Sequence, residues 1–249
     1  MTGFQKQVNA QPAFGIEGAP ASENPRASYV AGTGSLISGA AGVVIGRFGW
    51  ALPTNNTDGT TTETVVNTSI GVAAGLTRAP TGFVPNNQQG NFTGYLQESG
   101  MSILPGQNMT MMVRGDYWAV MLGTAAVRGY KAFANLFTGQ VSAYPAGTIV
   151  GGGAVTASFA TNVMTVTAVT GTPLAVGQLI TAATGATALP VNTYIASLGT
   201  GTGGAGTYNL TTTPGTIASQ ANVASVVVET PFSILSVSLA GEIAKIGRD

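Results

Sequence analysis

Residues Gly147–Val226 contain no charged side chain, and this constrains the fold more than any other feature of the chain. The segment consists almost entirely of Thr, Ala, Gly, Val, Leu and Ser. Disordered segments have few β-branched residues and a high net charge, whereas alternating apolar and polar residues are typical of half-buried strands. We therefore expect a small folded β domain here, with strands at Val163–Val169, Gln178–Ala182, Tyr194–Leu198, Thr207–Thr212 and Ile217–Ala218.

The sequence on either side of this segment has a different character, and the charged residues return towards the C-terminus. A segment that completes a domain after a second module makes that module an insertion. The predicted fold class is all-β. It comprises an extended N-terminal arm at 1–30, a β-barrel or sandwich core domain at 31–146 plus 224–249, and an inserted small β domain at 147–223. We expect the inserted domain to project outward, and residues 152–222 to be replaceable by a short linker.

The core domain is expected to begin with the glycine-rich stretch Ser35–Ala51, in which a strand starts at Val44 and Arg47 is the only charged residue. A turn-rich loop follows at 52–64, because Asp58-Gly59 is a turn signal. Residues 127–137 fit either a short helix or a strand. The remaining expected strands are Thr64–Ile70, Thr81–Val84, Tyr95–Leu104, Asn108–Arg114, Tyr117–Leu122 after a turn at Gly115-Asp116, and a pair around Pro231 in Val227–Ser238.

The N-terminal arm is polar and is interrupted by three prolines, which break regular structure. Its apolar residues are widely spaced, which indicates anchors on a partner surface; the alternative is a frayed terminus. The candidate partner contacts are these apolar residues together with two basic side chains as contact charges: Phe4, Phe14, Ile16, Tyr29, Arg26 and Arg47.

The composition argues against most classes of function. Only 7% of the residues are charged and the net charge is +0, so nucleic acid is not expected as a partner, because its binding relies on clustered Lys and Arg. Without Cys or His, the chain offers no Cys or His metal site, and we expect no metal, no cofactor and no disulfide. Arg47 and four glycines interrupt the longest apolar run, so no membrane span is expected, and the N-terminus lacks the apolar region of a signal peptide.

No pattern of catalytic residues is recognisable, and we do not expect an enzyme. Residues Gly201–Gly206 match the dinucleotide fingerprint GxGxxG, but a strand-like segment follows where that motif requires a helix. The carboxylates are isolated in the sequence, although a glycosidase pair could meet in space. Trp50, Tyr117 and Trp118 fit either a stacking platform for sugars or bases, or a half-buried core, which we favour.

Several motifs resemble the structural cement family of bacteriophages, the capsid decoration proteins. They are Asn24–Ser28, Ala40–Ala51, Gly82–Val84, Tyr95–Ser99, Gly115–Trp118, Glu229–Phe232 and Gly241-Glu242. The resemblance covers roughly residues 1–145 and 224–249. Val163–Ala168, Leu174–Ile180 and Leu198–Leu210 look like a small β module that recurs in phage virion and tail proteins, and this insertion departs from the plain cement pattern.

The resemblance implies a virion structural protein that binds the outer surface of the assembled head and bridges neighbouring major capsid subunits. The implied partners are the major capsid protein and further copies of the chain, as a homotrimer or homodimer at local symmetry axes. Synthesis is expected in the host cytoplasm. The alternative is a tail-associated or adhesin-like virion protein that binds host glycans through the inserted domain.

Overall fold

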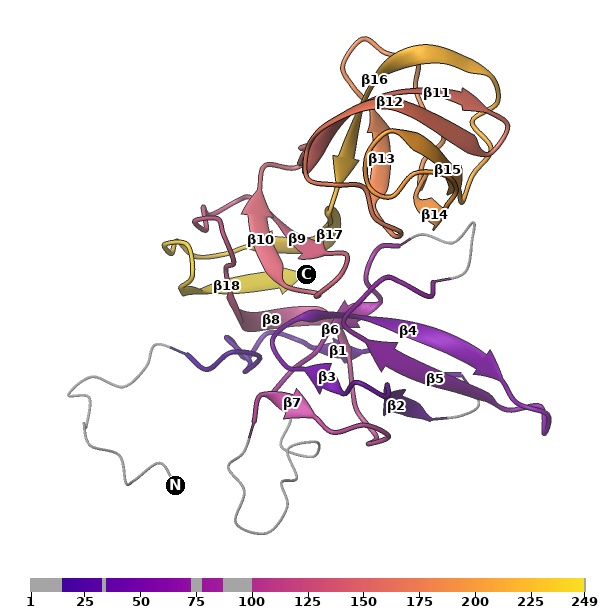
Figure 1. The fold of residues 1–249 in the computed structure, drawn as a ribbon. Coiled ribbons are helices and arrows are strands. Elements are labelled where there is room, and N and C mark those ends of the chain that lie inside the picture. Colours follow the sequence, from indigo (N-terminus) through magenta and orange to yellow (C-terminus); the bar gives the residue numbers. More distant parts are fainter. Residues whose placement is uncertain (1–14, 33–34, 73–77, 87–99, 249) are drawn as a thin grey trace, which may run out of the picture.

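The computed structural model describes residues 15–32, 35–72, 78–86 and 100–248. These residues form strands, turns and bends, which confirms the predicted all-β class. In Figure 1 a long sheet occupies the lower part of the molecule, and a second, curled sheet stands above it. A small pair of strands, β3 (Val43–Val44) and β7 (Ser102–Ile103), lies beside the long sheet.

The long sheet has ten strands, drawn from both sides of the uncharged segment. Nine of them follow the spatial order β10-β9-β17-β18-β8-β6-β4-β5-β2, and β1 pairs with β8 off this path. In chain order they are β1 (Ala27–Ser28), β2 (Leu36–Ser38), β4 (Phe48–Asn55), β5 (Thr61–Val66), β6 (Gly82–Phe83), β8 (Met112–Val120), β9 (Lys131–Asn135), β10 (Val141–Tyr144), β17 (Val227–Ile234) and β18 (Ile243–Arg248).

The long sheet carries its apolar side chains inward, where aromatic rings form the centre of the main core. Phe48 packs edge-on against Phe83 and Phe232, with ring centres 5.7 and 5.6 Å apart. Edge-to-face rings stabilise a core beyond the area they bury. Trp50 and Tyr117 are fully buried in the same cluster. Both therefore belong to the core, as the sequence favoured, and neither offers an exposed platform.

The second sheet has six strands, all of which lie within Gly153–Ser225. Their order is β13-β16-β11-β12-β15-β14, with bounds β11 (Gly153–Ala160), β12 (Val163–Gly171), β13 (Leu179–Ala182), β14 (Ile195–Leu198), β15 (Gly206–Leu210) and β16 (Ile217–Ser225). A backbone bridge between Leu179 and Tyr194 joins the first strand to the last, so the sheet closes on itself. We call it the closed sheet. It encloses its own core, which includes Phe159, Met164 and Tyr208.

The closed sheet is packed against the long sheet through a buried joint. Tyr194 comes from the closed sheet, yet it is 1% exposed and belongs to the main core cluster. Its ring lies under the guanidinium of Arg78, with 4.7 Å between the ring centre and Cζ. The backbone oxygen of Arg78 accepts a hydrogen bond of 2.8 Å from the indole of Trp50. Tyr194 and Trp50 are thus connected across the two sheets.

The structure differs from several strand predictions in the first half of the chain. The strand expected from Val44 is interrupted by a turn, because Gly46 takes a φ of +78°, and it becomes β3 and β4. The loop expected at 52–64 is mostly a hairpin of β4 and β5 that turns at Asp58-Gly59. The turn expected at Gly115-Asp116 is wrong, because Gly115 takes a positive φ inside the continuous strand β8.

Further differences lie in the second half. The strand alternative for 127–137 is confirmed, as β9. The pair expected in Val227–Ser238 is one strand, β17, whose register on β9 shifts between Glu229 and Ser233. Sequence reasoning missed β18 and β11, although Val155, Ala157 and Phe159 alternate inward along β11 and are a readable signal. The first half of the strand expected at Tyr95–Leu104 lies outside the described residues, and the described half contains β7.

Candidate functional site

The described part of the predicted arm, 15–30, lies along strand β8 of the chain's own long sheet, and the described segment continues to residue 32. The amide of Gly18 donates to the Trp118 oxygen at 2.7 Å, and the amide of Trp118 donates to the Ala19 oxygen at 3.0 Å. Further along, β1 pairs antiparallel with β8. These backbone hydrogen bonds satisfy groups on β8 that would otherwise form an open edge.

Asp116 fixes the middle of this arm segment. Its Oδ2 accepts hydrogen bonds from Ser22 Oγ at 2.6 Å and from Asn24 Nδ2 at 2.7 Å. Its backbone oxygen accepts from the amide of Ala21 at 2.9 Å. Hydrogen bonds to a carboxylate are stronger than those between neutral groups. Asp116 therefore holds the arm segment to β8 as an integral part of the fold.

The predicted contact residues of the arm differ in how far their side chains are exposed to solvent. Ile16 is 60% exposed and Arg26 is also exposed, so both side chains are available to a partner. The stem of Arg26 packs close to Gly115, where an added Cβ would lie 2.6 Å from Arg26 Cγ. Phe4 and Phe14 lie outside the described residues.

Tyr29 is half-buried and is committed to contacts within the chain. Burial raises its pKa, and the neighbouring Glu63 carboxyl raises it further. Glu63 is itself buried, and its Oε1 accepts a hydrogen bond of 2.9 Å from the amide of Gly32. Tyr29 therefore helps to hold the arm segment to strand β5, and its side chain is less available to a partner.

Arg47 is also half-buried, at the turn between β3 and β4. Its Nη1 donates to the Thr138 oxygen at 3.3 Å. Burial raises the pKa of nearby Glu17, and the positive charge of Arg47 opposes that rise. Glu17 packs so closely on Gly46 that an added Cβ there would lie 2.1 Å from its Cγ. Arg47 thus connects the arm, the turn and the β9–β10 loop.

A surface that sequence reasoning missed lies on two loops at one end of the long sheet. The loops are 121–130, between β8 and β9, and 235–242, between β17 and β18; we call them the loop pair. Both present exposed aliphatic side chains, among them Leu122, Val127, Val237 and Leu239. The signal was present in the sequence, since SVSLAGE places aliphatic residues where turns usually have polar ones.

Among the described residues, no cluster of three or more Asp, Glu, Cys or His side chains is arranged to hold a metal ion. The same part of the chain contains no helix long and apolar enough to cross a membrane. Residues 202–205 form bends, and Gly206 begins strand β15, so a strand and not a helix follows, as the sequence indicated. The candidate functional surface of the described residues is therefore the exposed apolar surface of the loop pair.

An all-β chain with few charges and with exposed aliphatic loops is typical of a structural protein that works within an assembly. The comparisons agree with this class. The model of the XM1 gp53 minor capsid protein family matches residues 4–247, and the chain belongs to this family. It is therefore a structural protein of the phage capsid, located in the virion. No curated protein matches the sequence.

Proposed function

We propose that the protein is a capsid decoration protein, or cement protein. It binds the outer surface of the assembled head and stabilises it by bridging neighbouring major capsid subunits. The observation that carries this proposal is the exposed aliphatic surface of the loop pair, on a chain with only 7% charged residues. Exposed apolar patches on soluble proteins mark interaction sites. Membership of a minor capsid family supports a shell subunit as the partner.

The mechanism is burial of apolar surface at many equivalent sites. Each contact removes aliphatic side chains from water, which contributes about 25 cal/mol for each Å² buried. Copies arranged as trimers or dimers on a symmetric shell engage several subunits at once, which multiplies modest affinities. Residues 15–32 already pair with β8, so they present side chains such as Ile16 and Arg26 and do not add a new strand to the shell. The role is structural, without catalysis or a cofactor.

The closed sheet is proposed to face away from the shell. Its exposed surface is built from an uncharged segment rich in Thr and Ala, and many of its hydroxyls face solvent. Burying a hydroxyl without a hydrogen-bond partner costs about 1–3 kcal/mol, so this surface is poorly suited to a dry interface. Its two connections to the long sheet, 145–152 and 226, lie together at one end, as expected of a module in a surface loop.

The test is direct binding. Purified protein is mixed with preformed, expanded shells that lack it, and the shells are sedimented and then heated. The proposal predicts saturable co-sedimentation and a higher temperature of shell disruption. Synthesis in the host cytoplasm predicts that the protein is soluble before it joins the shell. Failure to co-sediment with heads, together with recovery of the protein in isolated tails, would refute the decoration role.

A further inference from the structure

The loop pair is held together by its own hydrogen bonds. The amide of Ala126 donates to the Ser238 oxygen at 2.9 Å, and the amide of Ser238 donates back to the Ala126 oxygen at 3.3 Å. The amide of Gly241 donates to the Met121 oxygen at 2.6 Å. Two loops paired in this way present their side chains in a fixed arrangement, which lowers the entropy lost on binding.

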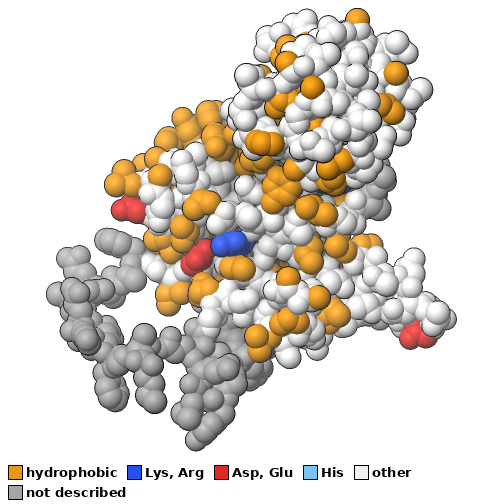
Figure 2. Space-filling view, viewed as in Figure 1, with side chains coloured by type: hydrophobic (Ala, Val, Ile, Leu, Met, Phe, Trp, Pro, Cys, Tyr) orange, Lys and Arg blue, Asp and Glu red, His pale blue; other side chains and the backbone are white. Residues whose placement is uncertain are grey.

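The aliphatic side chains of the loop pair form an apolar surface. Val237 is 75% exposed and Leu239 is 69% exposed, and Leu122 and Val127 on the other loop are each more than two-fifths exposed. Figure 2 shows hydrophobic side chains gathered on the left-hand edge of the molecule, where Figure 1 draws the yellow loop of residues 235–242. Such a surface is typical of a protein interface.

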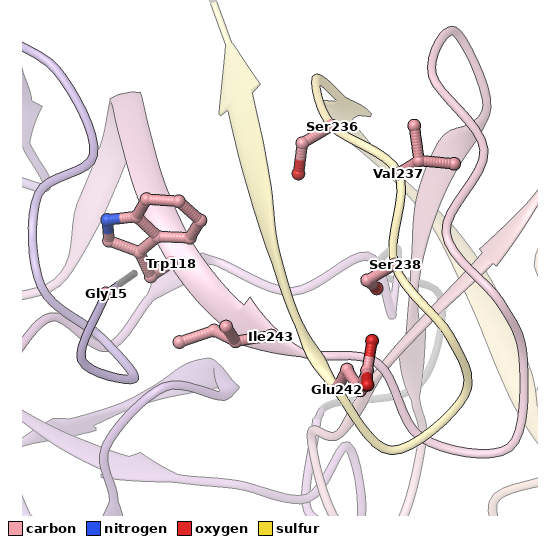
Figure 3. A pocket seen from close by; sticks show the side chains of 7 residues that line it. All are labelled: Gly15, Trp118, Ser236, Val237, Ser238, Glu242 and Ile243. Carbon is pink, nitrogen blue, oxygen red and sulfur yellow. The ribbon is translucent and has the colours of Figure 1, made fainter. Parts of the chain in front are cut away.

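A cavity of about 620 Å³ opens beside this surface. Trp118 and Ile243 form one side, and Ser236, Val237 and Ser238 form the other, with Glu242 next to them (Figure 3). This volume lies in the range of pockets that take a ligand or several side chains. Because Val237 belongs both to the cavity wall and to the apolar surface, the two are continuous.

The cavity wall contains one polar group without a hydrogen bond and one carboxylate without an ion pair among the described residues. Ser238 Oγ is buried and makes no hydrogen bond within the described residues. Glu242 Oε2 accepts a hydrogen bond of 3.1 Å from the amide of Leu239, which holds the carboxylate in place. No basic side chain of the described residues forms an ion pair with Glu242. The cavity therefore combines apolar side chains with a carboxylate that pairs with no cation of the described residues.

We propose that the loop pair and this cavity bind an apolar segment of a neighbouring shell subunit that carries one Lys or Arg. The stem of that residue lies along Ile243, its charged group reaches Glu242, and flanking aliphatic residues cover Val237 and Leu239. Such an anchor in a pocket, surrounded by apolar contacts, is the usual centre of a protein interface. This inference rests on the proposed function and names the chemistry of the contact.

A sugar fits the cavity less well than a protein segment. Sugars stack on an open aromatic face, but the indole of Trp118 is already covered. The backbone of Gly15 lies against it, since an added Cβ would be 2.4 Å from Trp118 Cδ2, and Lys245 Nζ lies 5.0 Å from the ring centre. The surface beside the cavity, which includes Val237 and Leu239, is aliphatic and suits the apolar side chains of a protein segment better than a hydroxyl-rich sugar.

The test compares the affinities of full-length variants for preformed shells that lack the protein. Glu242→Lys reverses the charge in the cavity, and Val237→Ser with Leu239→Ser removes the apolar surface. Both changes are at exposed side chains, so unchanged thermal unfolding is expected and is measured first. We expect each of these two variants to bind at least about tenfold more weakly than the wild type. The affinity of Glu242→Gln should lie between those of the wild type and Glu242→Lys.

The matched control is Val191→Ser, which removes an equally exposed aliphatic side chain from the closed sheet and should leave binding unchanged. If the wild type binds shells and the loop-pair variants bind equally well, this inference is wrong while the proposed function stands. If the wild type does not bind, both are wrong. Binding of a host oligosaccharide that Glu242→Gln abolishes would also overturn the protein segment as the occupant.

Discussion

The buried joint between the sheets predicts that Tyr194→Ala destabilises the whole protein, and not the closed sheet alone. The ring of Tyr194 comes from the closed sheet but is packed in the main core, beneath the guanidinium of Arg78. Removing it leaves a cavity next to the long sheet. It also leaves Arg78, which is 5% exposed and has an Nη1 without a hydrogen-bond partner in the described residues, without its aromatic neighbour.

The expected loss of free energy of unfolding follows from these contacts. Truncating a buried aromatic residue to Ala costs about 3–5 kcal/mol. The lost cation–π interaction adds about 0.5–2 kcal/mol. The total is about 3.5–7 kcal/mol, and its lower end corresponds to a fall of roughly 7–14 °C in melting temperature for a chain of this size. Tyr194→Phe keeps the ring and should cost only about 1 kcal/mol, the value of one hydrogen bond.

Calorimetry measures the melting temperature, and hydrogen exchange locates the loss. In Tyr194→Ala we expect faster exchange in both sheets. The matched control is Tyr208→Ala, which removes an equally buried ring that lies only in the core of the closed sheet. In that control, exchange should rise in the closed sheet and stay low in the long sheet. If the free energy of unfolding of Tyr194→Ala lies within about 1 kcal/mol of the wild-type value, Tyr194 does not couple the two sheets.

Three further predictions concern the turn at Gly46, Tyr117 in the main core, and the N-terminal segment. Gly46→Ala should lower the free energy of unfolding by more than the roughly 1–2 kcal/mol of strain at a positive φ, because its Cβ displaces Glu17. The control is Gly59→Ala, which has a similar φ and open space around it. In thermal unfolding it should show the strain alone. Burial raises the pKa of Tyr117 to about 12, so its contribution to stability is complete below pH 10 and is lost as pH rises to 12. Tyr117→Phe should make an alkaline titration of stability shallower, and an unchanged slope would contradict this. Deleting 2–28 removes a segment that pairs with β8 and should lower the melting temperature; a melting temperature equal to that of the wild type would contradict this.

Local patterns were sufficient to predict the all-β class and parts of several strands. Alternation identified parts of β5, β12, β13, β14 and β15, and glycine or proline between them indicated the turns. The same local view failed at Gly115-Asp116, since the turn signal there is overridden by pairing of β18 with residues 115–120 of β8. Pairing partners that are distant in the sequence decide such cases, and they leave no local pattern.

The candidate surfaces depended even more on contacts between distant segments. Ile16 and Arg26 were predicted as partner contacts and are exposed, whereas Tyr29 and Arg47 are tied to Glu63 and Thr138. Nothing in the sequence around Tyr194 indicates that it enters the core of another sheet. The expectation that 152–222 can be removed without cost did not consider this residue. We now expect the shortened protein to be less stable by an amount similar to Tyr194→Ala.

The most direct measurement of the central claim is a density map of the shell with the protein bound. The account predicts density on the outer surface, at contacts between major capsid subunits, with the loop pair facing the shell and the closed sheet facing away. It also predicts a basic side chain of a shell subunit beside Glu242. Density inside the shell or in the tail, or a closed sheet buried against the shell, would contradict the account.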